Sequence, residues 1–302
     1  MMETLQRKPE ILNNLVIFIL SHSNPDGVLT VNSLKKYGYT GDWYILLDDE
    51  DTTRDKYVQN FGQDKIILFN KAEVAKTFDR MDNETGTNTV VYARNACFDV
   101  AKKLGYTYFM EYDDDYYEFQ FRYEEDGHLR ALFPTNLDVV FECLLDYYIS
   151  IPMMKTLCIA QNGDFLGGTD GSHFKARWMR KAMNTFLCST ERPFTFLGYL
   201  NEDVNTYCTY GQRGDLFATV MDVSINQTDT QQKNNANGLT GAYVGEGTYR
   251  KSFYTVVCCP SFVKIGIIGN NHARIHHNVD WKTAVPKIIS DRWRIEDGAE
   301  KV

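Results

Sequence analysis

The amino-terminal part of the chain alternates short apolar runs with segments of helical periodicity. Residues 14–21 (NLVIFILS) are continuously apolar and β-prone, which is typical of a central strand buried on both faces. Residues 43–51 and 65–69 are two further runs of strand length. Between residues 88 and 105 the apolar positions recur at i, i+3, i+4 and i+7 and a glycine follows, which predicts a helix. The run YTYFMEY then predicts a fourth strand.

Beyond residue 121 this alternation stops. TLCIA, DFLGG and FTFLGY are short and β-like, NEDVNTYCTYG has a helical pattern, and LFATVMDVSI is typical of a strand. Residues 226–248 are rich in Gly, Asn and Gln, which predicts a long loop of the kind that often forms lids or binding loops. With no internal repeat or linker, residues 1–302 are expected to form one domain with two functional halves, about 14–120 and about 121–290.

Strands that alternate with helices predict an α/β fold. We expect a Rossmann-like, mostly parallel central sheet flanked by helices, followed by a half of α+β character. Acidic residues stand where two predicted strands end, Asp48 and Asp49 after the second and residues 113–115 after the fourth. In a parallel sheet the ligand crevice lies beyond the carboxyl ends of the strands, so these acids mark the expected site.

Composition and charge limit the function classes. Hydrophobic residues make up 43% of the chain and charged residues 24%, as in an ordinary globular protein. The 14% of aromatic residues suits a concave ligand site as well as a core. A net charge of -8 argues against a surface coated in positive charge for non-specific binding of nucleic acid, although a local basic groove remains compatible with it.

Cellular location is also indicated by the sequence. The seven cysteines are odd in number and form no CxxC pattern, which favours a reducing compartment. The longest apolar run, LVIFIL, is far shorter than the roughly 20 residues of a membrane span. The start, MMETLQRKPE, lacks the features of a secretory signal. We therefore expect a cytoplasmic protein without a membrane partner.

The three adjacent aspartates after the fourth strand need an explanation, because neighbouring carboxylates repel one another unless solvent or a cation offsets their charge. In an extended strand Asp113 and Asp115 would share one face and Asp114 the other. Two carboxylates on one face suit Mg²⁺ or Mn²⁺, whose coordination is usually completed by substrate phosphates. The alternative is a solvated acidic turn.

The block VVYARNACFDVAKKLGYTYFMEYDDD resembles the helix–strand–DxD block of the GT-A glycosyltransferases, which use nucleotide-sugar donors. GDFLGGTDG resembles their glycine-rich loop beside the donor sugar, NED at 201–203 their xED motif, and HARIHHNVDW the region of their carboxy-terminal histidine ligand. This resemblance covers about residues 14–290. It implies a GT-A fold, a UDP-sugar donor and a Mn²⁺ or Mg²⁺ cofactor, with the donor half first and the acceptor half second.

A narrower resemblance concerns the second half. The run TQQ…GLTGAY…GEGTYRKSFYTVVCCPSFVKI, followed by HHNVDWKTAVPKII, resembles the TET-associated glycosyltransferases, which include phage enzymes and the trypanosomatid base J glucosyltransferase. It implies transfer of glucose or a pentose to a hydroxymethylated pyrimidine in DNA, such as 5-hydroxymethylcytosine, in the host cytoplasm if a bacteriophage encodes the protein. The alternatives are a glycan, protein or lipid acceptor, or a catalytically silent binding module.

The resemblance assigns roles on the donor side. Asp113 and Asp115 would bind the metal and the diphosphate, and Asp114 the ribose or the sugar of the donor. Asp48 and Asp49 would accept hydrogen bonds from ribose or uracil. The alternative for Asp48 and Asp49 is that both are solvated loop acids.

Two residues on the predicted helix before the DxD strand are also donor-side candidates. Arg94 would bind the donor or pair with a site carboxylate, since its planar fork suits both; the alternatives are a pair with Asp99 or a surface charge. Asn95 has a site role by resemblance alone. Gly167 and Gly168 would let the backbone approach the sugar, unless they only form a tight turn.

On the acceptor side, Asp203 is the candidate general base of an inverting enzyme, with Glu202 as its competitor. The alternatives for Asp203 are a helix N-cap, or a residue that only positions the acceptor in a retaining enzyme. One of the late histidines would complete the metal shell as neutral imidazole, with His277 favoured over His276 and His272. In a strand His276 and His277 would point in opposite directions, so only one of them would bind.

Nucleic-acid contacts would come from two segments that mix basic and aromatic residues, in which cations neutralise phosphates and rings stack on bases. Ordinary solvated basic faces are the alternative. The first segment contains Arg177, Trp178, Arg180 and Lys181, and the second contains Lys282, Lys287, Arg292, Trp293 and Arg294.

Overall fold

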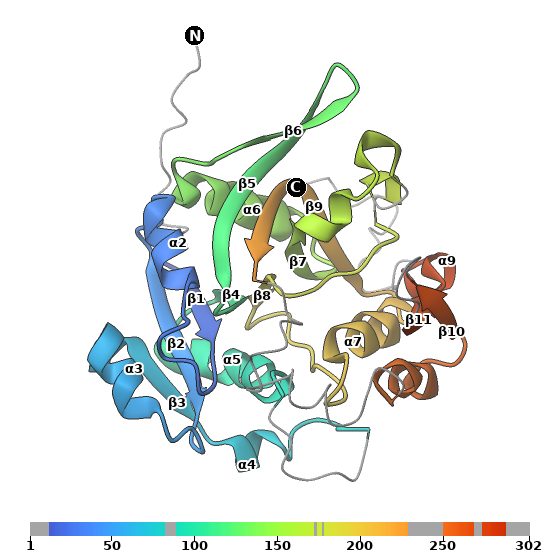
Figure 1. Cartoon of the computed structure of the whole chain (residues 1–302). Coiled ribbons are helices and arrows are strands. Elements are labelled where there is room, and N and C mark those ends of the chain that lie inside the picture. The colour runs from blue at the N-terminus through green and yellow to red at the C-terminus, as the bar shows by residue number, and fades with distance from the viewer. Residues whose placement is uncertain are drawn as a thin grey trace, which may run out of the picture.

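A large mixed sheet forms the centre of the computed structural model, which describes residues 12–81, 89–171, 174–176, 178–228, 250–268 and 274–287 (Figure 1). Within these residues the sheet has nine strands in the order β3-β2-β1-β4-β8-β7-β9-β5-β6, and β10 and β11 form a separate two-stranded sheet. The strands are β1 (Leu15–Leu20), β2 (Asp42–Asp48), β3 (Ile66–Phe69), β4 (Tyr108–Asp113), β5 (Tyr116–Glu125), β6 (His128–Leu132), β7 (Met154–Gln161), β8 (Phe186–Ser189), β9 (Leu216–Gln227), β10 (Val263–Ile268) and β11 (Arg274–Val279). The helices are α2 (Thr30–Lys36), α3 (Arg54–Phe61), α4 (Lys71–Val74), α5 (Val91–Leu104), α6 (Leu137–Ser150), α7 (Glu202–Gly211) and α9 (Trp281–Ala284), and residues 250–258 are also helical.

Strand direction confirms the predicted α/β class. β1 pairs in parallel with both β2 and β4, and β2 pairs in parallel with β3. β8 is antiparallel to both β4 and β7, whereas β7 and β9 are parallel. β5 is antiparallel to β9 and β6, so only β5 and β8 run against the other strands of the large sheet.

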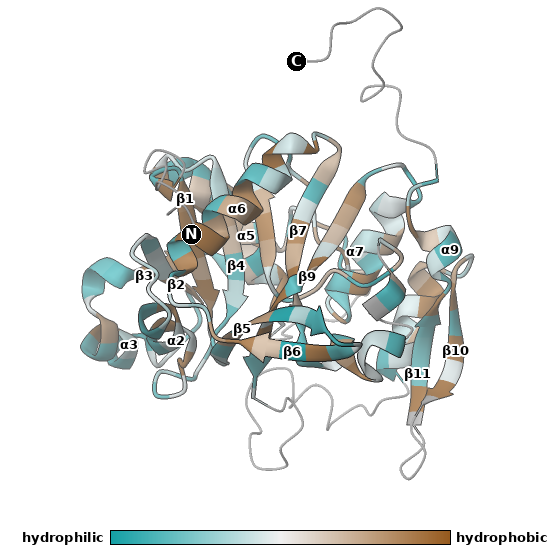
Figure 2. Cartoon of the chain, turned by 90° about the horizontal axis from the view of Figure 1, so that it is seen from above, coloured by the Kyte–Doolittle hydropathy of each residue, from teal (hydrophilic) through white to brown (hydrophobic). Residues whose placement is uncertain are grey.

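Helices bury both faces of the sheet, as the continuous apolar strands predict. Leu15, Ile17 and Ile19 of β1 belong to one core together with residues of α2 and α6. The alternate positions Val16 and Phe18 belong to a second core with residues of α5 and α7. The brown colour of β1 and β7 in Figure 2 shows how apolar these central strands are.

Helix α5 matches the helix predicted between residues 88 and 105, and β4 matches the strand predicted directly after it. The helix ends where Gly105 adopts a left-handed conformation, with φ 86°, and the N–H of Gly105 bonds back to the carbonyl of Lys102. A residue with a Cβ adopts this conformation only at a cost, which explains why a glycine ends the helix. The chain then enters β4, so α5 leads directly to the acidic turn.

Several parts of the second half differ from the expected secondary structure. DFLGG lies in two 3₁₀ turns (Asn162–Phe165 and Gly168–Asp170) and FTFLGY has no regular structure, so neither segment is a strand. Helix α6 was not predicted. The predicted boundary between residues 120 and 121 falls inside β5, whose hairpin with β6 projects from the body of the molecule (Figure 1). The predicted loop at 226–248 begins within β9, and residues 229–248 lie outside the described part.

The cysteines and the helices can be compared with the cysteine pattern and the short apolar runs of the sequence. All seven cysteines are free. Cys259 is buried, whereas Cys258 is only partly buried. No helix among the described residues has the length and hydrophobicity needed to cross a bilayer.

Candidate active site

The acidic turn is held in place by the start of α2. β4 ends at Asp113 and β5 begins at Tyr116, so the chain reverses through the two aspartates between them. The hydroxyl of Thr30 donates to the Asp113 carbonyl at 2.6 Å and accepts from the Tyr116 N–H at 3.0 Å. The N–H groups of Leu29 and Thr30 both donate to the carbonyl of Asp114. The turn backbone is therefore fixed from outside the turn.

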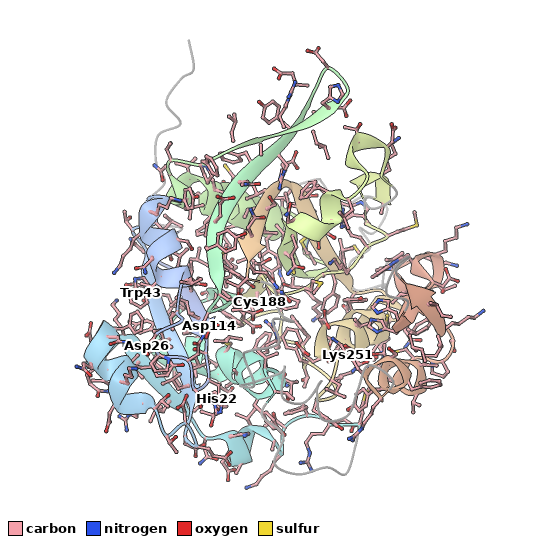
Figure 3. All side chains as sticks on the ribbon, in the orientation of Figure 1. His22, Asp26, Trp43, Asp114, Cys188 and Lys251 are labelled. Atoms are coloured by element: carbon pink, nitrogen blue, oxygen red, sulfur yellow. The ribbon has the colours of Figure 1, made fainter. Side chains whose placement is uncertain are left out.

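Asp114 faces the loop that follows β1. Its carboxylate accepts hydrogen bonds from the hydroxyl of Ser21 and from Asn24 Nδ2, the latter at 3.1 Å. The Tyr57 hydroxyl in turn bonds to Ser21 Oγ at 2.7 Å. His22, between these loop residues, is labelled with Asp114 in Figure 3. Asp114 thus joins the acidic turn to the β1 loop.

Asp113 and Asp115 are the two carboxylates predicted to bind a metal. Burial, opposed by Arg94 and reinforced by the charges of Asp115 and Asp203, raises the pKa of Asp113 to about 6. Burial also raises the pKa of Asp115 to about 6, although Thr228 Oγ1 donates to Asp115 Oδ2 at 2.8 Å. Asp115 Oδ1 is buried without a hydrogen-bond partner among the described residues. Carboxylates in this condition suit a hard divalent cation, so the donor set fits Mg²⁺ or Mn²⁺.

Asp115 lies in the turn and not in β4, so the alternation of side chains along a strand does not determine which way Asp115 faces. Tyr116 shows how tightly the group is packed. After burial, the charge of Asp113 is the main cause that raises the pKa of Tyr116 well above its usual value, and Asp115 adds to it. The Tyr116 hydroxyl therefore lies in the electrostatic field of both carboxylates.

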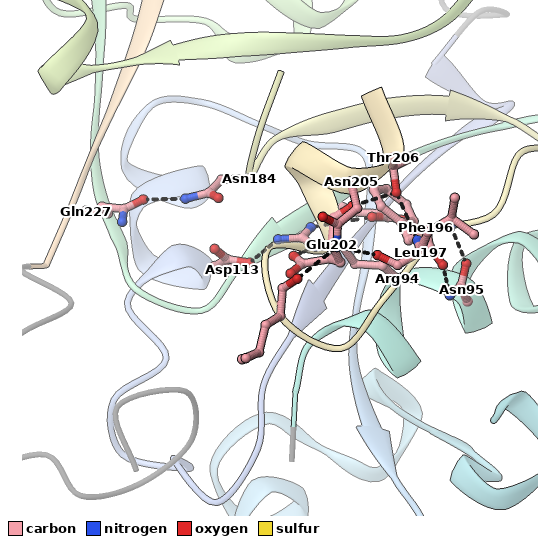
Figure 4. Close-up of polar contacts among 12 residues, drawn as sticks. Arg94, Asn95, Asp113, Asn184, Phe196, Leu197, Glu202, Asn205, Thr206 and Gln227 are labelled. Atoms are coloured by element: carbon pink, nitrogen blue, oxygen red, sulfur yellow. Dashed lines mark hydrogen bonds and ion pairs between the residues drawn. The ribbon is translucent and has the colours of Figure 1, made fainter. Parts of the chain in front are cut away.

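Arg94 is the hub that connects the two halves of the site (Figure 4). Its side chain is 2% exposed, and its Nη2 contacts Asp113 Oδ1 at 3.2 Å. Its Nε contacts Glu202 Oε1 at 3.2 Å, and its Nη1 contacts Glu111 Oε2 at 3.5 Å. The guanidinium lies 4.8 Å from the ring centre of Phe186. Arg94 is thus paired with site carboxylates and is neither a surface charge nor the partner of Asp99.

Glu202 and Asp203 open helix α7 in different environments. Glu202 is buried, and burial followed by the charge of Asp203 raises its pKa to about 7 despite the pair with Arg94. Asp203 is half-buried and acts on Asp113 electrostatically. The N-cap of the helix is Asn201, so Asp203 is not the cap. Arg94 therefore pairs with Glu202 and not with Asp203.

Asp48 and Asp49 have separate partners. Asp48 Oδ2 is 2.8 Å from His22 Nδ1. The hydrogen bond to Asp48 is the main cause that raises the pKa of His22. Asp49 accepts from Asn70 Nδ2 at 2.8 Å and from the Lys71 N–H at 2.9 Å. Asp48 therefore lies beside the β1 loop, whereas Asp49 caps the start of α4.

Asn95 has a structural role that the resemblance did not indicate. Its Nδ2 donates to the Phe196 carbonyl at 3.0 Å, and its Oδ1 accepts from the Phe196 N–H at 2.8 Å. Both ends of the amide thus hold the irregular segment 194–199, and the assignment of Asn95 to the donor stays a prediction. Gly167 has φ 88°, and a Cβ there would lie 3.1 Å from the Cα of Gly171. The tight-turn interpretation of Gly167 is thus the one that the geometry explains.

The late histidines lie on β11, in the separate hairpin. The rings of His276 and His277 lie side by side with centroids 4.3 Å apart, so the prediction that they point in opposite directions is wrong. Burial lowers the pKa of His277 to about 3, which keeps its ring neutral as a metal ligand requires. The described residues nevertheless contain no group of three metal-binding side chains. They therefore do not gather either histidine with Asp113 and Asp115, and His272 lies outside the described residues.

The predicted nucleic-acid residues separate into two groups. Arg180 is 5% exposed and its Nη2 contacts Asp164 Oδ1 at 3.0 Å, so it is a buried ion-pair residue and not a phosphate contact. Lys181 also contacts Asp164, at 3.5 Å. Trp178 is 41% exposed and is available for stacking. Lys282 and Lys287 are exposed. Four of the candidates lie outside the described residues, namely Arg177, Arg292, Trp293 and Arg294.

Sequence reasoning missed Glu111 and His22. Glu111 is completely buried in β4, and burial raises its pKa to about 8 against the opposing effect of Arg94. A single acid inside an otherwise apolar strand was a usable signal, because a buried carboxylate requires a partner. The sequence around His22 gives no comparable indication, because only the fold shows that this loop histidine lies beside Asp48.

A four-stranded parallel unit, β3-β2-β1-β4, with carboxylates at its carboxyl edge and an antiparallel strand beyond it, is the arrangement expected from the resemblance to the GT-A glycosyltransferases. The model of the TET-associated glycosyltransferase family matches residues 15–236. The chain therefore belongs to the TET-associated glycosyltransferase family.

Solved structures with a distantly similar fold include glucosyl-3-phosphoglycerate synthase from Mycobacterium tuberculosis. Its complex with Mg²⁺ and UDP has 9% sequence identity and a TM-score of 0.45, over 88% of each chain. Its complex with Mn²⁺ and UDP-glucose has 8% identity and a TM-score of 0.46, over 87% of this chain and 86% of the other. A likeness at this level says nothing about substrates. No curated protein matches the chain.

Proposed function

We propose that this glycosyltransferase transfers a sugar from a UDP-sugar to the hydroxyl group of a 5-hydroxymethylpyrimidine in DNA, with 5-hydroxymethylcytosine as the first acceptor to test. The observation that carries the chemistry is the acidic group around Asp113, which pairs with Arg94 and whose pKa is raised by the charges of Asp115 and Asp203. Family membership supports a sugar transferase, and the resemblance to phage and base J enzymes supports a modified pyrimidine as acceptor.

Each part of the site has a role in this reaction. Asp113 and Asp115 would hold Mn²⁺ or Mg²⁺, which when bound offsets the charge of the departing diphosphate. Asp203 orients the acceptor hydroxyl and accepts its proton if the configuration is inverted. The new bond joins the acceptor oxygen to the anomeric carbon, the bond from that carbon to UDP breaks, and UDP leaves. Arg94 keeps Glu202 out of this exchange by pairing with it.

Removal of the Asp115 carboxylate tests the proposal. DNA containing 5-hydroxymethylcytosine is incubated with the protein, Mn²⁺ and a panel of UDP-sugars, and its nucleosides are analysed by mass spectrometry. We expect a sugar-sized mass gain that disappears with EDTA and falls roughly 100-fold or more in Asp115→Asn. Asp99→Asn, an exposed aspartate on α5, serves as the matched control and should retain activity.

Other results would revise the proposal in defined ways. Metal-dependent release of UDP without modified DNA would refute the DNA acceptor and point to a glycan, protein or lipid. Absence of both signals with every donor would contradict the transferase chemistry assigned to these carboxylates. A mass gain in unmodified cytosine DNA would exclude the hydroxymethyl group as the acceptor.

A further inference from the structure

Three amide side chains from separate elements meet beside the acidic turn. Gln161 ends β7, Asn184 precedes β8, and Gln227 ends β9. Gln227 Oε1 accepts hydrogen bonds from Gln161 Nε2 at 3.1 Å and from Asn184 Nδ2 at 2.9 Å. We call these three residues the amide cluster; Figure 4 shows the contact between Gln227 and Asn184. All three are only half-buried, so they are not part of the core.

Three links place the amide cluster next to the candidate metal carboxylates. Gln227 pairs across the sheet with Tyr116, the residue that follows Asp115. The Tyr116 hydroxyl, which lies in the field of both carboxylates, donates to the Asn184 carbonyl at 2.9 Å. Thr228, the neighbour of Gln227, bonds to Asp115 through both its N–H and its hydroxyl. The cluster is therefore joined to the acidic turn on two sides.

The hydrogen-bond pattern of the cluster leaves donors for a ligand. An amide oxygen has two lone pairs, and both lone pairs of Gln227 Oε1 are used inside the cluster. Gln227 Nε2 makes no hydrogen bond to any described residue, and the oxygen contacts fix the direction in which this NH₂ group points. Asn184 also holds a left-handed backbone with φ 67°. Non-glycine residues keep such a conformation where the surroundings enforce it, often at ligand sites.

We propose that the amide cluster is the subsite that hydrogen-bonds hydroxyl groups of the transferred sugar, with Gln227 as the principal donor. This rests on the proposed function, because it requires the donor diphosphate to lie at Asp113 and Asp115. The transferred sugar is bonded directly to that diphosphate, so its ring lies within one sugar length of the carboxylates. The nucleoside is separated from the sugar by the whole diphosphate and lies farther from the cluster.

Paired binding measurements test this assignment. Isothermal titration calorimetry in Mn²⁺ gives the Kd of UDP and of UDP-glucose for the wild-type protein and for Gln227→Leu. We expect UDP-glucose to bind roughly 5- to 50-fold more weakly to the variant, the range for one or two lost hydrogen bonds, while the Kd of UDP stays within about twofold. Gln59→Leu, an exposed glutamine on α3, should change neither Kd.

Sugar preference gives a second readout that a purely structural role would not change. The panel then also includes UDP-galactose and UDP-xylose. Gln227→Leu should bring the Kd values of the three UDP-sugars closer together. Gln227→Glu should change the order in which the protein prefers them. If Gln227→Leu left the ratio of the Kd of UDP to the Kd of UDP-glucose unchanged, the subsite assignment would be wrong, and the proposed function would stand. Failure of the wild-type protein to bind UDP at all would overturn the proposed function and the subsite with it.

Discussion

The three consecutive aspartates have three different sets of partners, although their side chains are chemically identical. Asp113 is paired with Arg94, Asp114 is bonded to the loop after β1, and Asp115 keeps one buried oxygen without a partner in the described structure. Burial is nevertheless the main cause of the raised pKa of all three. Local partners, and not the residue type, therefore decide which aspartate is available to a cation.

The pair of His22 and Asp48 predicts a measurable dependence of stability on pH. The pKa of His22 is raised above its ordinary value of 6.5 in the folded protein. Its contribution to the free energy of unfolding is therefore fully present below pH 6.5 and is lost as the pH rises through the pKa of the folded state. Burial alone would raise the pKa of Asp48, but the hydrogen bond from His22 and the charge of His22 outweigh burial and lower this pKa below 3.8. The contribution of Asp48 is therefore lost only as the pH falls through that lower value.

We expect His22→Gln to reduce the free energy of unfolding by about 1 kcal/mol near about pH 5.5 and by much less near about pH 9. Urea unfolding of the two proteins at both pH values measures the difference. An equal loss at both values would mean that His22 contributes by packing and not by charge.

At the scale of single elements, Arg192 acts as the carboxy-terminal cap of α6. Its Nη1 donates to the carbonyls of Tyr148 at 3.0 Å and Ile151 at 3.1 Å, and its Nη2 donates to that of Ile149 at 3.2 Å. The last carbonyls of a helix have no partner within the helix, and a cation there also interacts favourably with the helix dipole.

Arg192→Ala should lower the free energy of unfolding by about 2–3 kcal/mol, because it removes the hydrogen bonds from a charged donor to the carbonyls at the end of α6. Arg192→Lys should cost less, since it keeps the charge but loses the fork. Chemical denaturation of both variants provides the measurement, with donor binding at low temperature as the control for an intact site. A loss below about 0.5 kcal/mol in Arg192→Ala would show that solvent caps this helix equally well.

The comparison of sequence with structure is most instructive for elements in the second half. FTFLGY was predicted to be β-like, yet backbone N–H groups of this segment bond to side chains instead of to a neighbouring strand. The Phe196 N–H bonds to Asn95, and the Leu197 N–H bonds to Thr206. In the first half the strands β1 to β4 and helix α5 were visible in the local sequence pattern, because burial imposes it. The site was only partly visible, since the pair of Arg94 and Glu202 joins residues that are distant in the sequence.

At the scale of the whole molecule, Arg94 is a single cation shared by carboxylates from both halves of the chain. Arg94→Met should cost about 3–5 kcal/mol, because it leaves Glu111 and Glu202 buried without their cation. Adding Glu111→Gln should recover part of the loss, because it removes one of these acids. Urea unfolding of the two single variants and the double variant gives the coupling energy.

An exposed ion pair supplies the control for this cycle. Glu125 contacts Arg130 at 3.5 Å with both side chains at least half exposed, so Glu125→Gln should change stability by less than about 0.5 kcal/mol. Additive effects of Arg94→Met and Glu111→Gln would contradict a shared cation. They would indicate instead that each residue is held by its own surroundings.

The strand order of the sheet also determines where this protein can be divided. β5 directly follows the acidic turn in the sequence but joins the sheet beside β9, and β7 and β9 come from the later part of the chain. A fragment ending at residue 120 would cut β5 in two and expose the unpaired edge of β4 where β8 belongs. Split reporters, circular permutants and domain swaps should therefore be opened at the tip of the β5–β6 hairpin, where no strand is interrupted.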